Sequence, residues 1–410
     1  MKCCNIILVA CLVSGISVLS AKDYKARCYS KSVYGEYTLY NLNAQDFPKF
    51  PVGVEPIYDI YIGRHGSRYI EYNGMYTTMA ELLGGAEKKD ILTATGKQFW
   101  KWYKQIYPLL EGHEQQLTDK GRQQLASLAE SIYKWLPHLF TGETQARVAT
   151  SPTLRVIHSE EAFVQRLEQL DGDLRIMKDT LAIMKARPYS PILKKYNDIY
   201  EPQFRKKLDT RGFVSIFLTD SSYIKQFAMS EYAFTLYLRN IIAGVKSLDI
   251  KVPSGYKKCV SKKMHKSILD AINLATYFGL GRCPYSHSQG LDTYKETWKN
   301  VVKTAWKDIE EGNGVTLNLN FTHDIVVLNI LAQLRAGTFG AEVQNLGELS
   351  NYWNCSYIPM ACNLQMCICK LTGDHRLIVY PLLNGRSISL PLKEIVPGAY
   401  LWEEVARLNQ

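Results

Sequence analysis

Several features that would narrow the fold or the chemistry are missing from this 410-residue sequence. It contains no internal repeat and no low-complexity segment, which excludes solenoid, fibrous and disordered proteins. Beyond residue 21, no apolar stretch is long enough to span a membrane. There is no CxxC pair, no HExxH motif and no P-loop, so neither a metal nor a cofactor is expected. What remains is an ordinary globular chain, with 46% hydrophobic and 21% charged residues.

Acidic residues are the scarcer charge, since 39 Asp and Glu stand against 49 Lys and Arg, a formal net charge of +10. A basic surface favours nucleic acid, an acidic surface or a polyanionic small molecule as the partner. No nucleic-acid-binding motif accompanies the charge, so nucleic acid is not expected as a partner. Charge alone does not choose between an acidic surface and a polyanionic small molecule.

The N-terminus has the layout of a secretory signal. Lys2 precedes an apolar run over residues 6–19, which ends in small residues. We expect residues 1–21 to be removed and the protein to be exported, either to a periplasm or outside the cell. Cys11 follows Leu8-Val9-Ala10 as in a lipoprotein signal, so a lipid-anchored form is the alternative. The apolar run continues beyond Cys11, which favours the first interpretation.

Ten cysteines are present, and three of them lie in the predicted signal. An oxidising environment permits disulfides, but the remaining seven leave at least one thiol unpaired within the monomer. Cys355 and Cys362 are the pair that we expect to be bonded. Cys367 and Cys369 would lie on one face of a strand, where the geometry opposes a bond between them. The other three are Cys28, Cys259 and Cys283.

A short strand followed by a polar turn and a helix occurs three times, with strands predicted at residues 58–62, 147–150 and 316–321. Strands that alternate with helices predict an α/β fold with a mainly parallel central sheet flanked by helices. In such sheets, ligands bind at the carboxyl ends of the strands, where helix N-termini offer free N–H groups. All three polar turns fall at that edge, so we expect them to form one site.

The character of the sequence changes between the second and third of these units. Residues 170–300 are rich in Lys and Tyr and show helical periodicity with few strand signals. They are predicted to form a mainly helical inserted cap domain. The α/β core then consists of residues 22–169 and 301–410.

The C-terminal part returns to strand character. Apolar runs predict strands at residues 366–371 and 377–382. Asn384-Gly385 between apolar runs predicts a hairpin turn, which leads into a further strand at residues 387–390.

Arg64-His65-Gly66-Ser67-Arg68 places two arginines around one histidine directly after the first strand. Like charges repel, so a fold gathers these groups where an anion binds, and the guanidinium fork matches phosphate oxygens. The cations lower the pKa of His65, which keeps the imidazole neutral and nucleophilic in acid. Gly66 is expected to let the backbone approach the ligand closely. The position after a strand argues against the alternative, a solvated basic turn.

His323-Asp324 and Arg155 carry less information on their own. A His-Asp dipeptide is common by chance, and the two residues would equally suit a structural histidine and a helix N-cap. Arg155 alone is an ordinary helix-face arginine. Their value comes from position, because each follows a predicted strand whose carboxyl end lies at the same edge as His65. We therefore assign them to the site.

Together, these motifs resemble those of the histidine acid phosphatases, the branch of the histidine phosphatase superfamily that includes phytases and multiple inositol polyphosphate phosphatases. The matching residues, in the family's order and spacing, are Arg64-His65-Gly66-Ser67-Arg68, Leu117-Thr118-Asp119-Lys120-Gly121, Ala149-Thr150-Ser151 with Arg155, and His323-Asp324. The chain departs from the family in having Ile70 where Pro is common. Its His-Asp pair is that of acid phosphatases and many phytases, whereas inositol polyphosphate phosphatases usually have His-Ala-Glu.

The resemblance implies a role for each matching residue. His65 is expected to attack phosphorus and form a phosphohistidine. Asp324 is expected to protonate the leaving alcohol and then to assist the water that releases phosphate. The phosphoryl oxygens are expected to be bound by Arg64, Arg68, Arg155 and His323. An acid that begins the reaction protonated implies an acidic pH optimum.

The substrate depends on groups around this shared core. Phytate or another inositol polyphosphate is the first choice, because Lys-rich segments would supply cations for a polyanion. The candidates for specificity are Lys88, Lys89, Lys257 and Lys258, with the further run Arg205-Lys206-Lys207. The alternative is that these are solvated surface charges. A broad acid phosphatase on sugar phosphates is the second choice, and an inactive exported polyanion-binding protein, against which the intact motifs argue, is the third.

Overall fold

The structure is a computed structural model that describes residues 37, 47–142, 144–179, 198–199, 202 and 208–408. The side chains of Lys257 and Lys258 are outside this description. The predicted signal at residues 1–21, Cys28 and the run Arg205-Lys206-Lys207 also lie outside it. Within the described residues, no helix combines the length and the apolar character that a membrane span requires.

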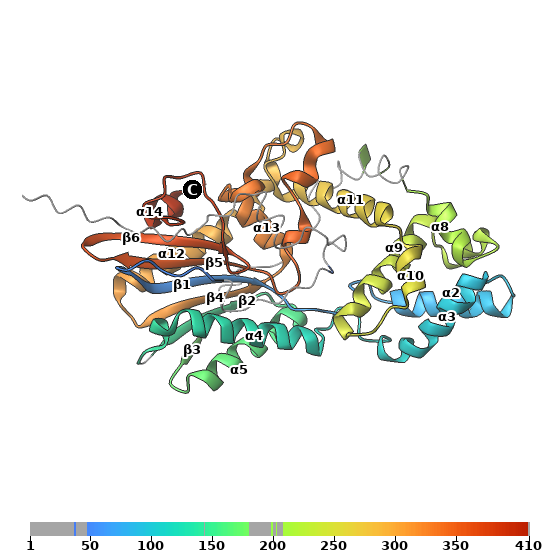
Figure 1. The fold of residues 1–410 in the computed structure, drawn as a ribbon, viewed down its shortest axis with the longest axis horizontal. Coiled ribbons are helices and arrows are strands. Elements are labelled where there is room, and N and C mark those ends of the chain that lie inside the picture. Colours follow the sequence, from blue (N-terminus) through green and yellow to red (C-terminus); the bar gives the residue numbers. More distant parts are fainter. Residues whose placement is uncertain are drawn as a thin grey trace, which may run out of the picture.

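One mixed sheet forms the core of the fold (Figure 1). Its strands, in spatial order, are β3 (Arg175–Lys178), β2 (Gln145–Thr150), β4 (Val315–Thr322), β1 (Val54–Arg64), β5 (Asn363–Leu371), β6 (Asp374–Leu383) and β7 (Arg386–Ser387), with β8 (Tyr400–Leu401) paired to β6. The strands from β3 to β1 are parallel to one another, whereas β5 to β8 pair antiparallel. The predicted α/β fold with a mainly parallel sheet is confirmed.

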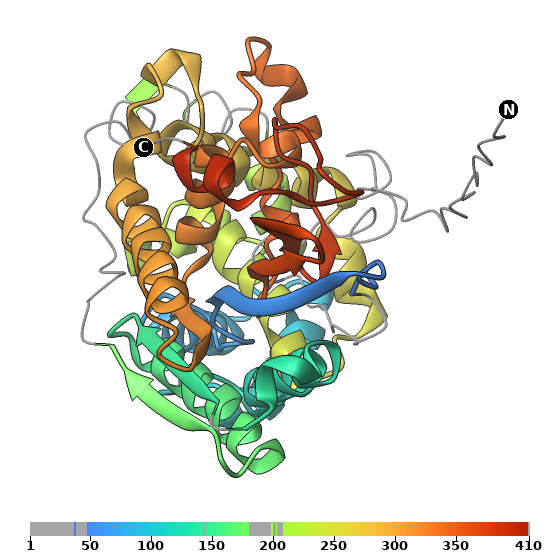
Figure 2. The same ribbon diagram turned by 90° about the vertical axis from the view of Figure 1, so that its left-hand side faces the viewer.

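Helices cover both faces of this sheet, as the end-on view in Figure 2 shows. Helices α4 (Asp119–Trp135) and α5 (Leu154–Leu170) pack on one face, where they share a hydrophobic cluster with β2 and β4. The other face carries a second cluster, formed with α11 (Lys262–Leu280), α12 (Lys295–Glu311), α13 (Asp324–Gln333) and α14 (Trp402–Arg407).

Strand β1 is buried on both faces because it lies in the middle of the sheet. Tyr58, Ile60 and Ile62 point to the face covered by α11 to α14. Tyr61 points to the opposite face, where its ring centroid lies 5.0 Å from that of Phe163 on α5. This alternation with a period of two is what a strand between two helical layers requires.

A mostly helical part lies beside the carboxyl ends of the strands, on the right of Figure 1. It contains α2 (Met75–Lys88), α3 (Ala94–Ile106), α8 (Thr210–Phe217), α9 (Glu231–Gly244) and α10 (Ser254–Cys259). Their apolar faces form a hydrophobic cluster of their own, in which the ring of Phe99 contacts those of Phe217 and Tyr256 at centroid distances of 5.5 and 5.2 Å.

This helical part does not coincide with the predicted insertion at residues 170–300. Helices α2 and α3 precede residue 170, yet they pack with α8 to α10. Strand β3 and helix α11 fall within 170–300, yet β3 extends the sheet and α11 packs against α13, in the cluster to which β1 also belongs. Helical periodicity identifies helices, but the core that each helix joins depends on tertiary packing.

The predicted hairpin at Asn384-Gly385 is confirmed. Both residues have positive φ, 55° and 73°, as a two-residue type I′ turn requires. The turn joins β6 to β7 in antiparallel register. The second strand is shorter than the predicted 387–390, because after Ile388, whose N–H donates to Pro381 O at 3.0 Å, the pairing with β6 ends.

No disulfide joins the cysteines in the described part of the chain. The predicted bond between Cys355 and Cys362 is therefore wrong. Cys355 Sγ lies 3.2 Å from Oγ1 of Thr276 on α11, whereas Cys362 is fully buried just before β5. The carbonyl of Cys362 accepts a hydrogen bond from Arg64 N at 2.8 Å, so the two thiols belong to different surroundings.

Candidate active site

Three polar segments meet at the carboxyl ends of β1, β4 and β2. The parallel register aligns the ends of these strands, so that the next residues, His65, His323 and Ser151, lie at one edge of the sheet. Backbone hydrogen bonds continue the alignment, because His65 N donates to Thr322 O and Ser151 N to Phe321 O, both at 3.0 Å. The structure thus brings the three predicted turns together.

His65 lies at the base of this edge and is only 2% exposed. Its Nδ1 is 2.9 Å from the carbonyl oxygen of Gly66. A carbonyl oxygen only accepts, so Nδ1 carries the proton of the neutral ring and Nε2 keeps a lone pair. Burial, followed by the charges of Arg64, Arg68 and Arg155, holds the pKa of this imidazole well below its ordinary value. A neutral ring with an unprotonated nitrogen is the form that a nucleophile requires.

Arg64, the last residue of β1, is buried and held from two sides. Its Nη1 donates to the carbonyl of Ile358 at 2.7 Å, and its Nη2 lies 3.1 Å from Oδ2 of Asp324. Asp324 begins α13, and its Oδ1 accepts the N–H of Ile325 at 2.9 Å. Burial raises the pKa of Asp324, but the nearby cations, Arg64 foremost, outweigh burial and lower it. Asp324 is therefore an ionised partner of Arg64 in this structure.

Arg68 and Arg155 complete the group of cations, and both contact Glu71. Arg68 Nη2 lies 3.1 Å from Glu71 Oε2, and Arg155 Nη2 lies 3.8 Å from Oε1. The arginine side chains are 3% and 10% exposed, whereas that of Glu71 is 43% exposed. Burial and then the charge of Arg68 lower the pKa of Arg155. Two guanidinium groups therefore converge on one carboxylate.

His323 is positioned by two hydroxyl groups from the segment between β2 and α5. Its Nε2 lies 3.1 Å from Oγ of Ser151 and 3.2 Å from Oγ1 of Thr153. Its ring also stands edge-on to that of His65, with 5.7 Å between centroids. Burial and then the charge of Arg155 lower the pKa of His323 to about 4. His323 is thus a neutral hydrogen-bonding group beside the nucleophile.

The loop that carries His65 packs directly on the start of α4. A Cβ added to Gly66 would lie 2.5 Å from Gly121 O, and one added to Gly121 would lie 2.3 Å from Ser67 O. Oγ1 of Thr118, the N-cap of α4, accepts from Gly121 N at 3.0 Å and donates to Ser67 O at 2.9 Å. Gln124 Oε1 accepts from both N and Oγ of Ser67. Gly66 therefore lets a helix approach the loop.

The arginines, the histidines and Asp324 line a cavity of about 390 Å³. Its cationic part is formed by the three arginines of the site, and the two neutral histidines lie beside them. The rest of its lining is mixed: Glu71, Gln115, Thr153 and Asp324 are polar, whereas the side formed by α11, α13 and residues 355–358 is mostly apolar and includes Ile272, Ile325, Leu328, Cys355 and Ile358, with Thr276 among them. Helices α5 and α13 both begin at the cavity, where their positive dipole ends favour an anion.

Four lysines are predicted to set specificity, and those whose side chains the structure describes do not line this cavity. Lys88 ends α2 and Lys89 follows it, and neither lines the cavity. With 14 residues, α2 is about 21 Å long, and Lys88 lies at the end of it that is farther along the chain from Glu71. Lys257 and Lys258 belong to α10, in the helical part, and their side chains are not described.

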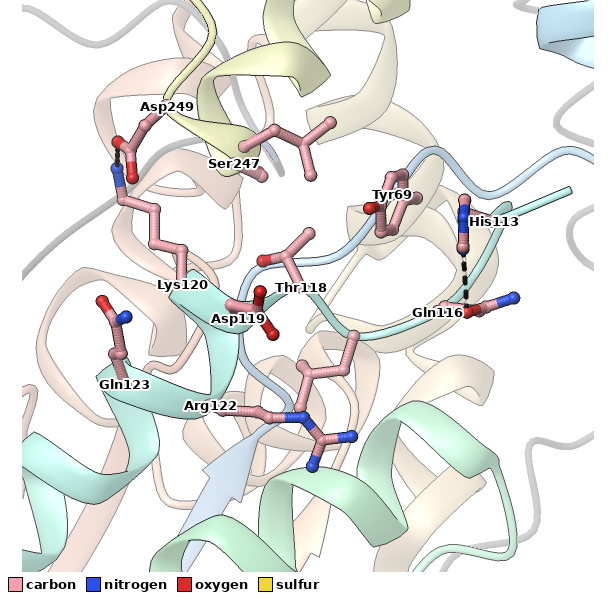
Figure 3. A pocket seen from close by; sticks show the side chains of 12 residues that line it. Tyr69, His113, Gln116, Thr118, Asp119, Lys120, Arg122, Gln123, Ser247 and Asp249 are labelled. Atoms are coloured by element: carbon pink, nitrogen blue, oxygen red, sulfur yellow. Dashed lines mark hydrogen bonds and ion pairs between the residues drawn. The ribbon is translucent and has the colours of Figure 1, made fainter. Parts of the chain in front are cut away.

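A second cavity, of about 430 Å³, lies between the start of α4 and the turn at residues 247–249 (Figure 3). Tyr69 and His113 stack there with ring centroids 5.1 Å apart, and Lys120 forms an ion pair with Asp249. None of the predicted site residues lines this cavity. The buried histidines and the three arginines line the cavity around His65, so that cavity is the candidate active site.

Neither a protein-family model nor a curated protein matches this chain, but solved structures do. The multiple inositol polyphosphate phosphatase of Bifidobacterium longum in complex with inositol hexasulfate has a TM-score of 0.73 at 16% identity, over 91% of this chain and 96% of that one. Its complex with phosphate has the same score and identity, over 92% and 98%. The phytase from D. castellii has a TM-score of 0.62 at 12% identity, over 91% and 84%. The chain has the fold of these phosphatases. The resemblance found in the motifs is confirmed at the level of the fold.

Sequence reasoning missed three residues of the site. Thr153 precedes an amphipathic helix, as an N-cap residue does. Its hydroxyl does not cap the helix but forms a hydrogen bond with Nε2 of His323. Ser151 was noticed only as part of a motif. Glu71 carries no signal that separates it from any exposed glutamate, since its contacts with Arg68 and Arg155 arise from folding.

Proposed function

We propose that this protein is an acid phosphomonoesterase that acts through a phosphohistidine at His65. The observation that carries the proposal is the buried, neutral ring of His65, whose Nδ1 is bound to Gly66 O and whose Nε2 is left unprotonated beside three arginines. A phosphoryl group in this cavity would meet guanidinium forks for its oxygens and a nucleophile for its phosphorus. The shared fold with phosphatases supports the same reaction class.

In the first half of the reaction, Nε2 of His65 attacks phosphorus and the bond to the leaving alcohol breaks. Asp324 donates its proton to the alcohol oxygen as that bond breaks. The charge on the phosphoryl oxygens is stabilised by Arg64, Arg68, Arg155 and His323. In the second half, water attacks phosphorus, the carboxylate of Asp324 accepts the water's proton, and the N–P bond breaks to regenerate His65.

Asp324 must be protonated for the first half, although the cations lower its pKa in this structure. A bound phosphoryl dianion brings negative charge beside Asp324 and competes for Arg64, which raises the pKa of the carboxyl group. An acidic medium populates the protonated form further. The lowered pKa of His65 keeps the nucleophile unprotonated in the same medium. The reaction needs a proton on Asp324 and none on Nε2 of His65. Both conditions are met together only in acid, which favours an acidic pH optimum.

Inositol polyphosphates are the proposed substrates, because the similar folds include a phosphatase in complex with inositol hexasulfate and a phytase. Broad activity on sugar phosphates is the second candidate, and one observation favours it. The side of the cavity formed by α11, α13 and residues 355–358 is mostly apolar, and neither Lys88 nor Lys89 lines the cavity. A polyanion gains less from such a wall than a singly phosphorylated sugar does.

Hydrolysis of a chromogenic phosphate monoester near pH 4–5 tests the reaction. We expect His65→Ala to lower kcat/KM by at least about a thousandfold. His113→Ala, an exposed histidine outside the cavity, serves as the matched control and should keep full activity. Full activity in His65→Ala would overturn the mechanism.

A comparison of phytate with glucose 1-phosphate tests the substrate. Release of inorganic phosphate from phytate at the higher kcat/KM would support the first candidate. Turnover of glucose 1-phosphate without turnover of phytate would replace it with the second.

We further propose that the protein is exported. An acidic optimum suits an enzyme that works outside the cytoplasm, and the predicted signal at residues 1–21 would direct it there. Sequencing the N-terminus of the purified mature protein tests this. A start near residue 22 supports a free exported form, whereas a start at a lipidated Cys11 supports the anchored alternative.

A further inference from the structure

Glu71 lies inside the phosphoryl site, although no step of the mechanism uses it. It follows Arg68 by three residues and lines the cavity with Arg155 and the two histidines. Its two carboxylate oxygens point to two different arginines, with distances of 3.1 Å to Arg68 Nη2 and 3.8 Å to Arg155 Nη2. These are two of the guanidinium groups that the proposed function assigns to phosphoryl oxygens.

We propose that Glu71 is an internal anion that occupies part of the phosphoryl site and leaves it when a phosphoryl group binds. The inference rests on the proposed function of the same site. A carboxylate and a phosphoryl group present the same kind of acceptor to an arginine. The Nη2 groups of Arg68 and Arg155 cannot hold both anions in the same place, and two anions in one small cavity repel each other. Binding is therefore an exchange.

The surroundings of Glu71 suit a side chain that leaves while the arginines stay. Glu71 is 43% exposed, so its carboxylate reaches water without crossing a barrier of packed side chains. The two arginines are 3% and 10% exposed and remain enclosed. Arg68 also keeps a separate anchor, because its Nη1 donates to Tyr69 O at 3.0 Å. Departure of Glu71 thus exposes a formed pair of guanidinium groups.

This exchange has two consequences for binding. The apparent affinity for phosphate is the intrinsic affinity multiplied by the fraction of molecules in which Glu71 has left the arginines. Because this fraction is less than one, phosphate binds more weakly and product phosphate is released more readily. Once displaced, the carboxylate remains at the mouth of the cavity, where it opposes a substrate that carries further phosphates beside the reacting one. Glu71 therefore weakens the binding of free phosphate, and it weakens the binding of a polyphosphorylated substrate more than that of a monophosphate.

Glu71→Gln tests the proposal, since it removes the charge and keeps the shape. We expect the Kd for inorganic phosphate, measured by titration calorimetry at pH 5, to fall by about three- to tenfold. The gain in kcat/KM should be larger for phytate than for glucose 1-phosphate. Glu81→Gln, the same change at an exposed position on α2, is the matched control and should leave the Kd unchanged.

A role for Glu71 in holding the two arginines in place predicts the opposite sign. Phosphate binding that is unchanged or weaker in both Glu71→Gln and Glu71→Ala, with unfolding midpoints like that of the wild type, would overturn the proposal. Calorimetry needs no turnover. Tighter phosphate binding in Glu71→Gln by a protein that hydrolyses no monoester would therefore refute the proposed function and still support the exchange.

Discussion

Alanine at position 121 tests the contact between the loop that carries His65 and the start of α4. Gly121 is the third residue of this helix and is buried. A Cβ there would lie 2.3 Å from Ser67 O, 2.9 Å from Ser67 N and 2.7 Å from Leu117 Cδ1. The first two are backbone atoms of the loop. They move only if the whole loop moves, and His65 moves with it.

Two effects of Gly121→Ala oppose each other. Alanine stabilises a helix interior relative to glycine by about 1 kcal/mol. Overpacking of a filled site costs about 1–3 kcal/mol, and a contact as short as 2.3 Å with a backbone oxygen belongs at the upper end. We expect a net loss of about 2 kcal/mol in the free energy of unfolding. A shift of the nucleophile by about 1 Å should also lower kcat/KM by about a hundredfold.

Urea unfolding followed by tryptophan fluorescence measures the first effect, and hydrolysis of a chromogenic monoester measures the second. The matched control is Gly255→Ala in α10, where an added Cβ meets no atom within 4 Å. The control should be as active as the wild type and equally or slightly more stable. A Gly121→Ala protein that matches this control in both assays would refute the packing argument.

Three further predictions concern the acid, the support of His323 and the buried histidines. Asp324→Asn should slow hydrolysis of an alkyl phosphate more than that of 4-nitrophenyl phosphate, whose leaving group needs little protonation; steady-state rates on both substrates measure the difference. Ser151→Ala and Thr153→Ala each remove one hydroxyl from His323 Nε2, so KM should rise severalfold in each variant and further in the double variant. The pKa values of His265 and His323 are lowered from 6.5 to about 4. Between these values the unfolded chain binds more protons than the folded one, so the free energy of unfolding should decrease as pH falls from about 6.5 to about 4. Urea unfolding at a series of pH values measures this slope.

Each of these predictions has an outcome that contradicts it. Equal losses on the two substrates would remove Asp324 from the role of acid. An unchanged KM in the Ser151→Ala, Thr153→Ala double variant would show that the hydroxyls do not position His323. His265→Gln should flatten the pH slope, whereas His113→Gln at an exposed position should not; equal slopes in all three proteins would refute the linkage to His265.

The placement of the three polar turns could be predicted because it depends on local pattern and on a general rule. Strands β1, β2 and β4 are short apolar segments that precede helices, and parallel strands of such units end at one edge of the sheet. His65, Arg155 and His323 therefore had to come close together once the strands were recognised. The structure adds the distances and the direction in which each side chain is held.

The predictions that failed depended on packing between distant segments. The division at residues 170–300 failed because α2 and α3 join the same cluster as α8 to α10. The disulfide between Cys355 and Cys362 failed because the two residues face different elements. Composition and periodicity describe a segment, but not the neighbours that it acquires.

For the site itself, the sequence determined which residue types follow each strand, and hence a histidine between arginines with a carboxylate nearby. Only the tertiary structure decided that Gly66 O binds Nδ1 of His65, that Gly121 fills the space beside the loop, and that Glu71 lies between two arginines. The physical reason is the range of the interactions. Strand and turn preferences act over a few residues, whereas tautomer, close packing and ion pairing are set by atoms that folding brings together from different elements.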